Sequence, residues 1–328
     1  MKYAKDTRPK GVANKAAEVL VEALPWIKNI TGKTVVIKYG GSAMVDEQLR
    51  ADVMNDIVLL KIVGVNPVIV HGGGKAITEA MDFLQLPVEF KDGQRVTTPE
   101  AMDLVRTVLM GKVNQELVEA LNEHGNFAVG VSGADAGVIV AEQASPELGR
   151  VGRITRINSP LLDDLVAGDY IPVVASVALG EDGGFYNVNA DMVAGHIAAA
   201  IGAHKVVFLT DVDGLYENFE NKDSLISNLT LFEAQYMVEN NIVSTGMIPK
   251  LKSCIHALDS GVFRAHIING ITPHSLLLEL LTSTGVGTTM HSTEESCTFD
   301  THPLGNFASK LLENRQHAAS ATPNNQIF

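Results

Sequence analysis

Two hydrophobic segments of this sequence run directly into glycines and then into helical patterns. The first, TVVIKYGG at residues 34–41, precedes apolar residues at helical spacing between Asp46 and Val63. The second, VIVHGGGKAI at residues 68–77, leads into an amphipathic segment that ends near Leu86. Clustered glycines cost backbone entropy, so these two turns indicate a need for bare backbone at both places. A strand, a glycine turn and a helix in succession are typical of an α/β fold.

The rest of the chain repeats this alternation. Short apolar runs recur between helical segments, at FAVGV (127–131), VIVAE (138–142), GRVGRI (149–154), IPVVA (171–175), KVVFLT (205–210) and FRAHII (263–268). Strands that are apolar on both faces are typical of parallel sheets covered by helices on each side. We therefore predict an α/β fold with an open, mainly parallel sheet sandwiched by helices.

The pattern divides the chain into four segments. Residues 1–29 form a predicted N-terminal helical arm, because Asn14 to Lys28 is amphipathic. Residues 30–180 form an N-lobe and residues 181–298 a C-lobe, with the boundary in a glycine-rich hairpin or loop between Leu179 and Asn189. Residues 299–328 lose the periodic pattern and are predicted to be a surface tail. The prediction is thus two lobes plus an N-terminal helix.

Composition excludes several classes of protein. The net charge of −13 and the pI near 5.2 argue against a general nucleic-acid binder. No apolar run approaches the ~20 residues of a membrane-spanning helix, and the first residues lack the apolar core of a signal peptide. Only Cys254 and Cys297 occur, too few for a disulfide scaffold. We expect a cytoplasmic protein without nucleic-acid or membrane partners.

The glycines of VIVHGGGKAI fit none of the commonest motifs. An HGGG oxyanion hole requires a G-x-S-x-G nucleophile, and the nearest segment, GVSGA at 130–134, ends in alanine. A Walker A loop would need a glycine at Ile69 and a hydroxyl residue at Ala76, and a dinucleotide fingerprint would need a glycine at Ile77. A tight turn without a ligand is the simplest explanation of one such turn. Two of them on parallel strands lie at the same sheet edge, where backbone N–H groups form anion sites.

Charged residues near other strand ends fit an anion site. Lys38 lies at the end of an apolar strand, where its ammonium either reaches solvent or neutralises a phosphate beside the glycine turn. STGMIPKLKS (244–253) opens a helix and carries Lys250, an unusual cation for a helix N-terminus. TDVDGLY (210–216) either caps a strand or borders a nucleotide and its Mg²⁺. In NVNAD (187–191), Asn189 or Asp191 serves as an N-cap, whereas Asn187 lies upstream of any cap.

Phosphoryl transfer needs positioning and positive charge more than covalent chemistry, and these residues suit it. In chain order, VIKYGGSA, VHGGGKAI, GQRVT, NVNAD, LTDVDGLY and STGMIPK resemble the motif series of the amino-acid kinase family, from Lys33 to about Met290. Within the family the chain is most similar to members that phosphorylate N-acetyl-L-glutamate. GQRVT separates it from carbamate kinases, aspartokinases and uridylate kinases. The resemblance implies an N-lobe that binds the acetylated amino acid and forms a dimer, and a C-lobe that binds MgATP.

The resemblance also implies a role for each matched residue. Lys38 and Lys250 would neutralise the transferring phosphoryl group as catalytic residues, Asp191 would orient both lysines, and Asp211 would hold Lys250. The substrate-binding residues would be Gly73, Gly74, Arg95 and Asn187, with Arg95 on the α-carboxylate. The ATP-binding residues would be Gly40, Gly41, Thr210, Asp211, Gly246 and Lys250.

The implied reaction moves the γ-phosphoryl group of ATP to the side-chain carboxylate of N-acetyl-L-glutamate. The products are N-acetyl-L-glutamyl 5-phosphate and ADP, in the biosynthesis of arginine, with Mg²⁺ as the cofactor of ATP. A carboxylate is already ionised at neutral pH, so no general base is needed. One alternative is another carboxylate or carbamate kinase of the same family. A catalytically silent amino-acid sensor is the other, and the presence of both lysines and Asp191 counts against it.

The two ends of the matched region suggest regulation. The arm ending in EALPWIK and the segment HSLLLELLTSTGVGTTM (274–290) resemble the hexameric family members that L-arginine inhibits. Glu279 lies in an otherwise apolar helix, where an unpaired carboxylate would be costly and a guanidinium would satisfy it. The resemblance places the arginine site at Trp26, Lys205, His274, Glu279 and Gly285, with Trp26 in place of an expected tyrosine. We expect a homo-oligomer, a dimer or a trimer of dimers; the alternative is an arm folded back on its own subunit.

Overall fold

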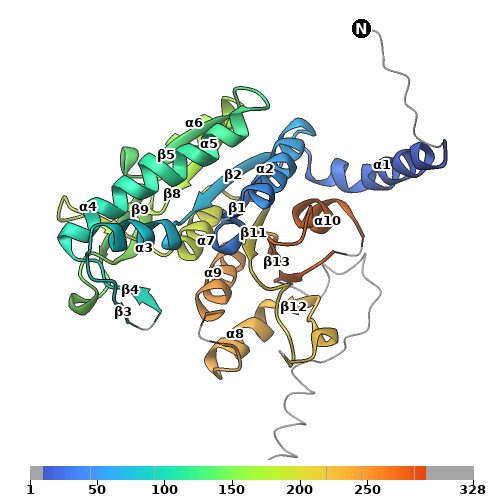
Figure 1. Cartoon of the computed structure of the whole chain (residues 1–328). Helices are drawn as coiled ribbons and strands as arrows, with labels where there is room; N and C mark the ends of the chain where they lie inside the picture. Colours follow the sequence, from blue (N-terminus) through green and yellow to red (C-terminus); the bar gives the residue numbers. More distant parts are fainter. Residues whose placement is uncertain are drawn as a thin grey trace, which may run out of the picture.

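The computed structural model describes residues 10–44, 46–91, 93–218, 220–244, 246–283 and 285–292, and these form an α/β fold around one large sheet (Figure 1). The sheet has eight strands in the order β12 (Asn228–Thr230), β14 (Thr288–His291), β13 (Arg264–Asn269), β11 (Lys205–Thr210), β1 (Thr34–Tyr39), β2 (Asn66–His71), β8 (Ile171–Ala175) and β5 (Ala128–Ser132). All neighbouring pairs are parallel except β13 and β14. The predicted fold class is therefore confirmed.

A smaller sheet of four strands packs beside it, in the order β10 (Phe185–Asn187), β9 (Val177–Gly180), β6 (Ile139–Gln143) and β7 (Gly152–Ile157). Strands β9 and β10 pair antiparallel, which confirms a hairpin within residues 179–189. A further two-stranded hairpin is formed by β3 (Phe90–Lys91) and β4 (Gln94–Arg95). The apolar runs VIVAE and GRVGRI thus contribute to this second sheet and not to the parallel one.

Helices cover both faces of the large sheet. One face carries α2 (Glu47–Ile62), α4 (Pro99–Val108), the π-helical turn η2 (Leu109–Asn114), α5 (Gln115–Asn122) and α10 (Ser275–Leu281), with α3 (Gly74–Phe83) against α4. The other carries α6 (Pro160–Ala167), α7 (Ala190–Ala200), α8 (Leu231–Glu239) and α9 (Ile248–Asp259). Short 3₁₀ turns complete the fold: η1 (Gly41–Met44), η3 (Asp135–Gly137), η4 (Pro146–Leu148) and η5 (Lys222–Ser224).

The alternation of side chains along each strand explains the two-sided core. On β1, Val35 and Ile37 pack into the cluster under α2 and α5, whereas Val36 packs into the cluster under α7 and α9. On β2, Ile69 lies on the first side and Val68 on the second. Successive strand residues point to opposite faces, so a run with no polar member can be buried on both sides.

The N-terminal helix α1 (Lys10–Ile30) extends away from the rest of the molecule in Figure 1. It passes through Pro25 without ending there. Its C-terminal part packs on the core through Trp26, Ile27 and Ile30, and it contacts α10. Earlier in the helix, Leu20 is 67% exposed and its apolar neighbours Val19, Val21 and Leu24 are exposed as well. The helix therefore presents an uncovered apolar surface.

The large sheet takes four strands from each side of residue 180 along the chain. Strands β5, β8, β2 and β1 come from residues before 180, and β11, β13, β14 and β12 come from residues after it. The two groups meet where β1 pairs with β11. The two-lobe division itself stays a prediction, and the predicted tail at 299–328 lies outside the described residues. Within the part of the chain that the structure describes, no helix is long and apolar enough to cross a membrane.

Candidate functional site

The carboxyl ends of β1 and β2 bring the two glycine turns together. These strands pair in parallel, with Lys38 beside Val70 and Tyr39 beside His71, so the residues that follow lie side by side. Gly40 leaves room for the side chain of Lys38, two positions earlier, because a Cβ atom on residue 40 would lie 2.7 Å from Lys38 Nζ. Gly41 has a φ of +74°, a conformation that favours glycine. Local sterics therefore explain both glycines of the first turn.

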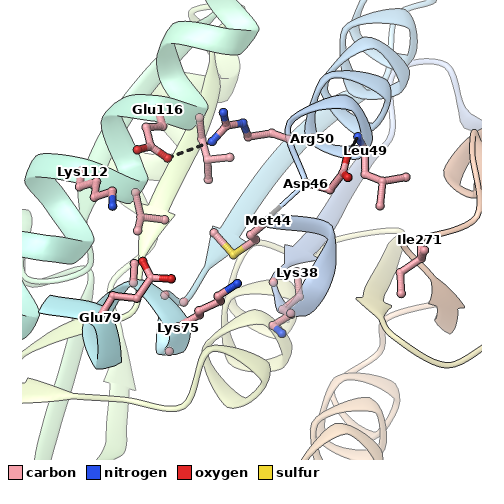
Figure 2. A pocket seen from close by; sticks show the side chains of 18 residues that line it. Lys38, Met44, Asp46, Leu49, Arg50, Lys75, Glu79, Lys112, Glu116 and Ile271 are labelled. Atoms are coloured by element: carbon pink, nitrogen blue, oxygen red, sulfur yellow. Dashed lines mark hydrogen bonds and ion pairs between the residues drawn. The ribbon is translucent and has the colours of Figure 1, made fainter. Parts of the chain in front are cut away.

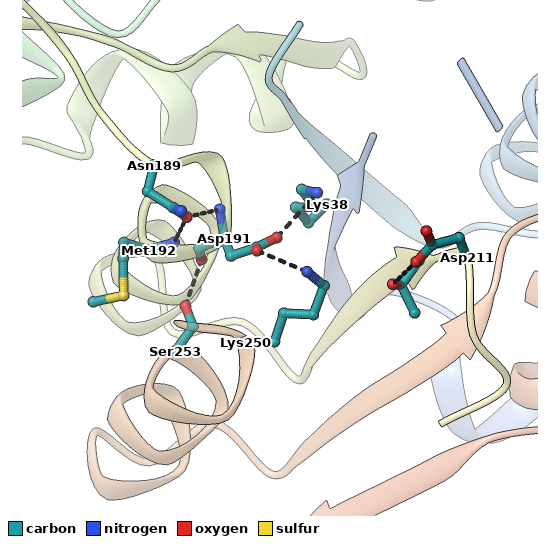
Figure 3. A network of polar contacts seen from close by, with 8 residues as sticks. Lys38, Asn189, Asp191, Met192, Asp211, Lys250 and Ser253 are labelled. Carbon is teal, nitrogen blue, oxygen red and sulfur yellow. Dashed lines mark hydrogen bonds and ion pairs between the residues drawn. The ribbon is translucent and has the colours of Figure 1, made fainter. Parts of the chain in front are cut away.

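A carboxylate joins the two predicted catalytic lysines (Figure 3). Asp191 Oδ1 lies 3.0 Å from Lys38 Nζ, and Asp191 Oδ2 lies 3.2 Å from Lys250 Nζ. The three residues come from β1, the first turn of α7 and the first turn of α9. The prediction that Asp191 contacts both lysines is confirmed by this geometry.

The side chain of Asp191 is ionised in this setting. Burial acts to raise the pKa of its carboxyl group, but the charges of Lys38 and Lys250 outweigh that effect and hold the pKa below its usual range. Asn189 caps α7, since its side chain accepts hydrogen bonds from the N–H groups of Asp191 and Met192. Ser253 on α9 donates to the Asp191 carbonyl and fixes α7 against α9. The result is a rigid support for two ammonium groups.

The end of β11 carries the other predicted nucleotide residues. Thr210 is buried, and its hydroxyl donates to Asp211 at 3.1 Å, while Asp211 itself is exposed. Among the described residues, no ion pair joins Asp211 to Lys250, which pairs with Asp191 instead. The expected Asp211–Lys250 contact is therefore not seen in this structure. Gly246 precedes α9, which begins at Ile248, two residues beyond the predicted Ser-Thr-Gly opening.

Sequence reasoning missed a polar cluster beside this strand end. Asp213 accepts from the Tyr216 hydroxyl at 2.5 Å and from the Asn269 amide at 2.9 Å. These hydrogen bonds lower the pKa of Asp213. Lys222 lies 4.5 Å from the centroid of the Tyr216 ring. The signal in the sequence was the second acid of TDVDG, but the partner Asn269 comes from another strand.

A pocket of about 220 Å³ gathers all four predicted substrate residues, Gly73, Gly74, Arg95 and Asn187. Arg95 is 7% exposed, and its Nη2 donates to the Gly74 carbonyl at 2.9 Å and to the Thr78 hydroxyl at 2.6 Å. Burial lowers the pKa of this guanidinium, which nevertheless stays charged at neutral pH. A fixed cation thus faces an amide across a small cavity.

Thr97, the threonine of the motif GQRVT, links the two sides of that pocket. Its hydroxyl donates to the Arg95 carbonyl at 3.1 Å and accepts from the Asn187 amide at 3.3 Å. Thr97 is completely buried. Thr97 therefore aligns Arg95 with Asn187 through a hydrogen bond from an amide 90 positions further along the chain.

A larger pocket of about 920 Å³ adjoins the first and shares Gly72, Gly73 and Gly74 with it. Figure 2 shows Lys38 at one end of this pocket and the ion pair of Arg50 with Glu116, 3.0 Å long, at the other. The pocket therefore opens onto Lys38 and both glycine turns from the side of α2 and α5.

The predicted arginine-site residues come together only in part. Glu279 and Gly285 are adjacent, since a Cβ on Gly285 would lie 3.0 Å from Glu279 Oε2. Lys205 is 7% exposed, and burial lowers its pKa to about 8 while the charge of Glu279 opposes that shift. His274 instead contacts Asp56 on α2, with 2.7 Å between Nδ1 and Oδ1. Trp26 packs on the same hydrophobic core as α10.

The premise that Glu279 lacks partners is wrong. Oε1 lies 2.7 Å from His266 Nδ1 and accepts from the Thr289 hydroxyl at 2.9 Å. Oε2 accepts from two backbone N–H groups, Val286 at 2.7 Å and Gly287 at 3.2 Å. Burial acts to raise the pKa of Glu279, but these hydrogen bonds outweigh it and hold the pKa at about 2. The sequence could not reveal this, because β13, β14 and the loop before β14 supply the partners.

Comparison with known proteins identifies the family. The model of the amino acid kinase family matches residues 33–269, most of the described chain. The chain belongs to this family. The match begins just before β1 and ends with β13, so it covers both glycine turns, Asp191 and Lys250.

Individual relatives are similar over most of their length. The acetylglutamate kinase of Caldanaerobacter subterraneus subsp. tengcongensis is 51% identical over 274 residues, 83% of this chain and 92% of that protein. The acetylglutamate kinase of Halothermothrix orenii is 48% identical over 277 residues, 83% of this chain and 96% of that one. Among solved structures, N-acetylglutamate synthase from Neisseria gonorrhoeae, complexed with coenzyme A and N-acetyl-glutamate, has a TM-score of 0.74. At 22% identity, covering 95% of this chain and 71% of that one, it supports the fold alone.

Proposed function

We propose that this protein transfers the γ-phosphoryl group of ATP to the side-chain carboxylate of N-acetyl-L-glutamate. The observation that carries this proposal is the pair of ammonium groups on Asp191, at the sheet edge that also holds the glycine turns. Two relatives at 51% and 48% identity, both acetylglutamate kinases, support the choice of substrate. The products are N-acetyl-L-glutamyl 5-phosphate and ADP, an early step toward arginine.

The smaller pocket suits an acetylated, doubly negative amino acid. Arg95 supplies a buried guanidinium for the α-carboxylate, and Asn187 supplies an amide that can pair with the acetamide or with that carboxylate. Gly73 and Gly74 line this pocket and also the larger one, which Lys38 lines as well. A substrate held by Arg95 and Asn187 would direct its side-chain carboxylate toward the glycine turns.

The reaction forms one bond and breaks one. A side-chain carboxylate oxygen attacks the γ-phosphorus, the bond from that phosphorus to the β,γ-bridging oxygen breaks, and ADP leaves with the electron pair. Because the nucleophile is already an anion, the protein only has to position it and offset the negative charge. Lys38 would approach that charge from β1, and Lys250 from α9, each held by Asp191. The N–H groups of Gly41 and Gly73 would add hydrogen bonds to phosphate oxygens.

The nucleotide would lie over the ends of β11 and β13, with Thr210, Asp211 and Gly246 beside it. Among the described residues, no group of three or more His, Cys, Asp or Glu side chains forms a metal cage. Mg²⁺ usually keeps waters and takes one or two carboxylates together with phosphates, so it would enter with ATP. Asp211, exposed at the end of β11, would be one carboxylate for it. When bound, Mg²⁺ would neutralise phosphate charge.

A substrate panel tests this proposal. ADP release from MgATP should depend on N-acetyl-L-glutamate and be far slower with L-glutamate, L-aspartate or carbamate. Hydroxylamine should trap the acyl phosphate as a hydroxamate. Turnover with carbamate or aspartate and not with acetylglutamate would favour another kinase of the family. Binding of acetylglutamate without any turnover would favour a sensor.

We also propose that L-arginine inhibits the enzyme and that the protein is a homo-oligomer, a trimer of dimers joined through α1. The exposed apolar residues of α1 support a contact with another subunit. Lys205, Glu279 and Gly285 lie together near the contact of α1 with α10. Because Glu279 already has four partners, arginine would have to compete with His266 or Thr289 for it. The two-lobe division, with the N-lobe forming the dimer, belongs to the same proposal.

A further inference from the structure

A buried histidine lies directly under the second glycine turn and has no part in the chemistry described above. His71 ends β2 and is completely buried. Its Nδ1 lies 2.9 Å from the carbonyl oxygen of Gly72, and its Nε2 lies 2.9 Å from the side-chain nitrogen of Asn114. Asn114 is also completely buried and is the last residue of the π-helical turn η2. The ring thus joins the glycine turn to a helix across the core.

The contacts of Asn114 determine which nitrogen of the ring carries the proton. Asn114 Nδ2 lies 2.8 Å from the Val173 carbonyl, which can only accept. The amide nitrogen therefore has two hydrogens and two acceptors, Val173 O and His71 Nε2. Burial lowers the pKa of His71 to about 4, so the ring is neutral at physiological pH. With Nε2 accepting, the one proton of the neutral ring is on Nδ1, and it donates to Gly72 O.

That hydrogen bond sets the direction of the next amide. In a trans peptide the C=O and N–H groups point in opposite directions. Because the Gly72 carbonyl points at the His71 ring, the Gly73 N–H points away from the ring. Within the described part of the chain, this N–H donates to no backbone carbonyl, as is usual at the start of a helix such as α3. Gly73 lines both pockets.

The π-helical turn supports the same peptide from a second direction. A Cβ on Gly73 would lie 2.7 Å from Leu109 Cδ2 and 3.2 Å from Val113 Cγ2, and both side chains belong to η2. Space for Asn114 is kept open on β5, since a Cβ on Gly130 would lie 2.1 Å from Asn114 Oδ1. π-helical turns inside α-helices occur frequently at functional sites. Here η2 supports the glycine turn in two ways. The apolar side chains of Leu109 and Val113 contact Gly73 directly, and Asn114 acts through its hydrogen bond to His71.

We propose that His71 and Asn114 are positioning residues that hold the Gly72–Gly73 peptide so that the Gly73 N–H faces the transferring phosphoryl group. The proposal rests on the proposed kinase function. Neither residue touches substrate; each acts through the orientation of the peptide. Loss of the Nδ1–H donor should therefore affect the rate of transfer more than the binding of either substrate.

Two matched variants isolate that donor. In His71→Asn the shorter amide can place an N–H where Nδ1 was, so the hydrogen bond to Gly72 is kept and that to Asn114 is lost. In His71→Gln the longer amide reaches the position of Nε2, so the Asn114 contact is kept and the Gly72 contact is lost. Both variants remove the ring, so their thermal midpoints should be similar.

We expect kcat of His71→Asn to stay within about threefold of wild type. We expect kcat of His71→Gln to fall at least about tenfold, but by less than the roughly 10²–10³-fold loss that follows when such an N–H donor is removed altogether. KM for ATP and for acetylglutamate should change less than threefold in both. Equal kcat values in the two folded variants, or a loss confined to KM, would overturn the proposal. If the wild type showed no acetylglutamate-dependent turnover, the kinase function would fail instead, and the two failures are distinguishable.

A measurement on the wild-type protein does not depend on the variants folding. Nitrogen-15 NMR of the imidazole, assigned through cross-peaks to Gly72 and Asn114, should show protonated Nδ1 and unprotonated Nε2. The two shifts should stay constant between pH 5.5 and 8. A proton on Nε2, or titration of the ring within this range, would contradict the assigned hydrogen-bond direction and with it the proposal.

Discussion

Replacing Asp191 by asparagine tests the central ion-pair arrangement. The substitution keeps the size of the side chain and removes the charge that Lys38 and Lys250 share at 3.0 and 3.2 Å. Two ammonium groups on one carboxylate are on the order of 6 Å apart, and at an effective dielectric constant of about 20 their repulsion is about 3 kcal/mol. Removing one partner of a buried ion pair typically costs about 3–5 kcal/mol.

The expected loss of stability in Asp191→Asn lies between about 3 and 5 kcal/mol, the range for removing one partner of a buried ion pair. For a chain of 328 residues that corresponds to a fall in Tm of roughly 4–7 °C. Thermal unfolding followed by circular dichroism at pH 7 measures it.

The pH dependence gives the sign of the effect. The pKa of Asp191 is lowered in the folded protein, so its contribution to stability is present above the unfolded-state pKa of about 3.9 and is lost only as pH falls through the lower folded value. The difference between wild type and Asp191→Asn should thus be constant from pH 8 to pH 5. A difference that faded between pH 7 and 5 would mean that burial, and not the lysines, controls this carboxyl group.

Nucleotide and a matched variant complete the test. ATP without acetylglutamate should raise the Tm of Asp191→Asn more than that of the wild type, because the phosphates replace the missing negative charge. Asp182→Asn is the control: its carboxylate pairs with Arg150 on the surface and is 48% exposed, so little stability should be lost. Equal losses in the two variants would refute the reasoning about the buried arrangement.

The remaining predictions concern activity and assembly. Lys38→Met and Lys250→Met should each lower kcat by about two or more powers of ten with smaller changes in KM. Lys38→Arg should also lose activity, because the guanidinium does not fit beside the glycine turn. A near-normal kcat in a steady-state assay would remove the substituted lysine from catalysis. Arg95→Ala should raise KM for acetylglutamate and leave ATP affinity, measured by calorimetry, nearly unchanged; an unaltered KM would place this arginine outside the substrate site. Deleting residues 1–28 should give an active dimer, by analytical ultracentrifugation, that responds poorly to arginine, and in the full-length protein arginine should alter the fluorescence of Trp26. A full-length dimer indifferent to millimolar arginine would contradict the regulatory proposal and leave the kinase proposal intact.

Much of the fold was predictable because its signals are local. The successive apolar residues VVI (35–37) and VVFL (206–209) give their strands apolar side chains on both faces, which indicates a sheet covered on both sides. The start of α4 is likewise a local signal: Thr98 is the N-cap, its hydroxyl accepts from the Ala101 N–H, and Pro99 is the first residue of the helix. The sequence does not, however, show which strands belong to the large sheet and which to the small one. The apolar run of β6 resembles the runs of the large sheet, but β6 lies in the small sheet.

The candidate site divides in the same way. Residue type and motif order were enough to select Lys38, Lys250 and Asp191, because a cation near glycines or at a helix N-terminus is unusual in any context. Which acid would hold which lysine was not decided locally: Asp211 and Asp191 were both candidates, and only the packing of α7 on α9 brings Asp191 to Lys250.

Contacts between distant segments account for what the sequence left open. In the sequence Glu279 looked unpaired, because its partners lie on β13, on β14 and in the loop before β14. The hydrogen bond of His71 to Asn114 was not foreseeable either, because the two residues are 43 positions apart. Periodicity and helix capping depend on residues within about one helical turn of each other, so both can be predicted from the sequence. Hydrogen bonds of buried polar groups depend on which elements pack together, so the tertiary structure alone decides them.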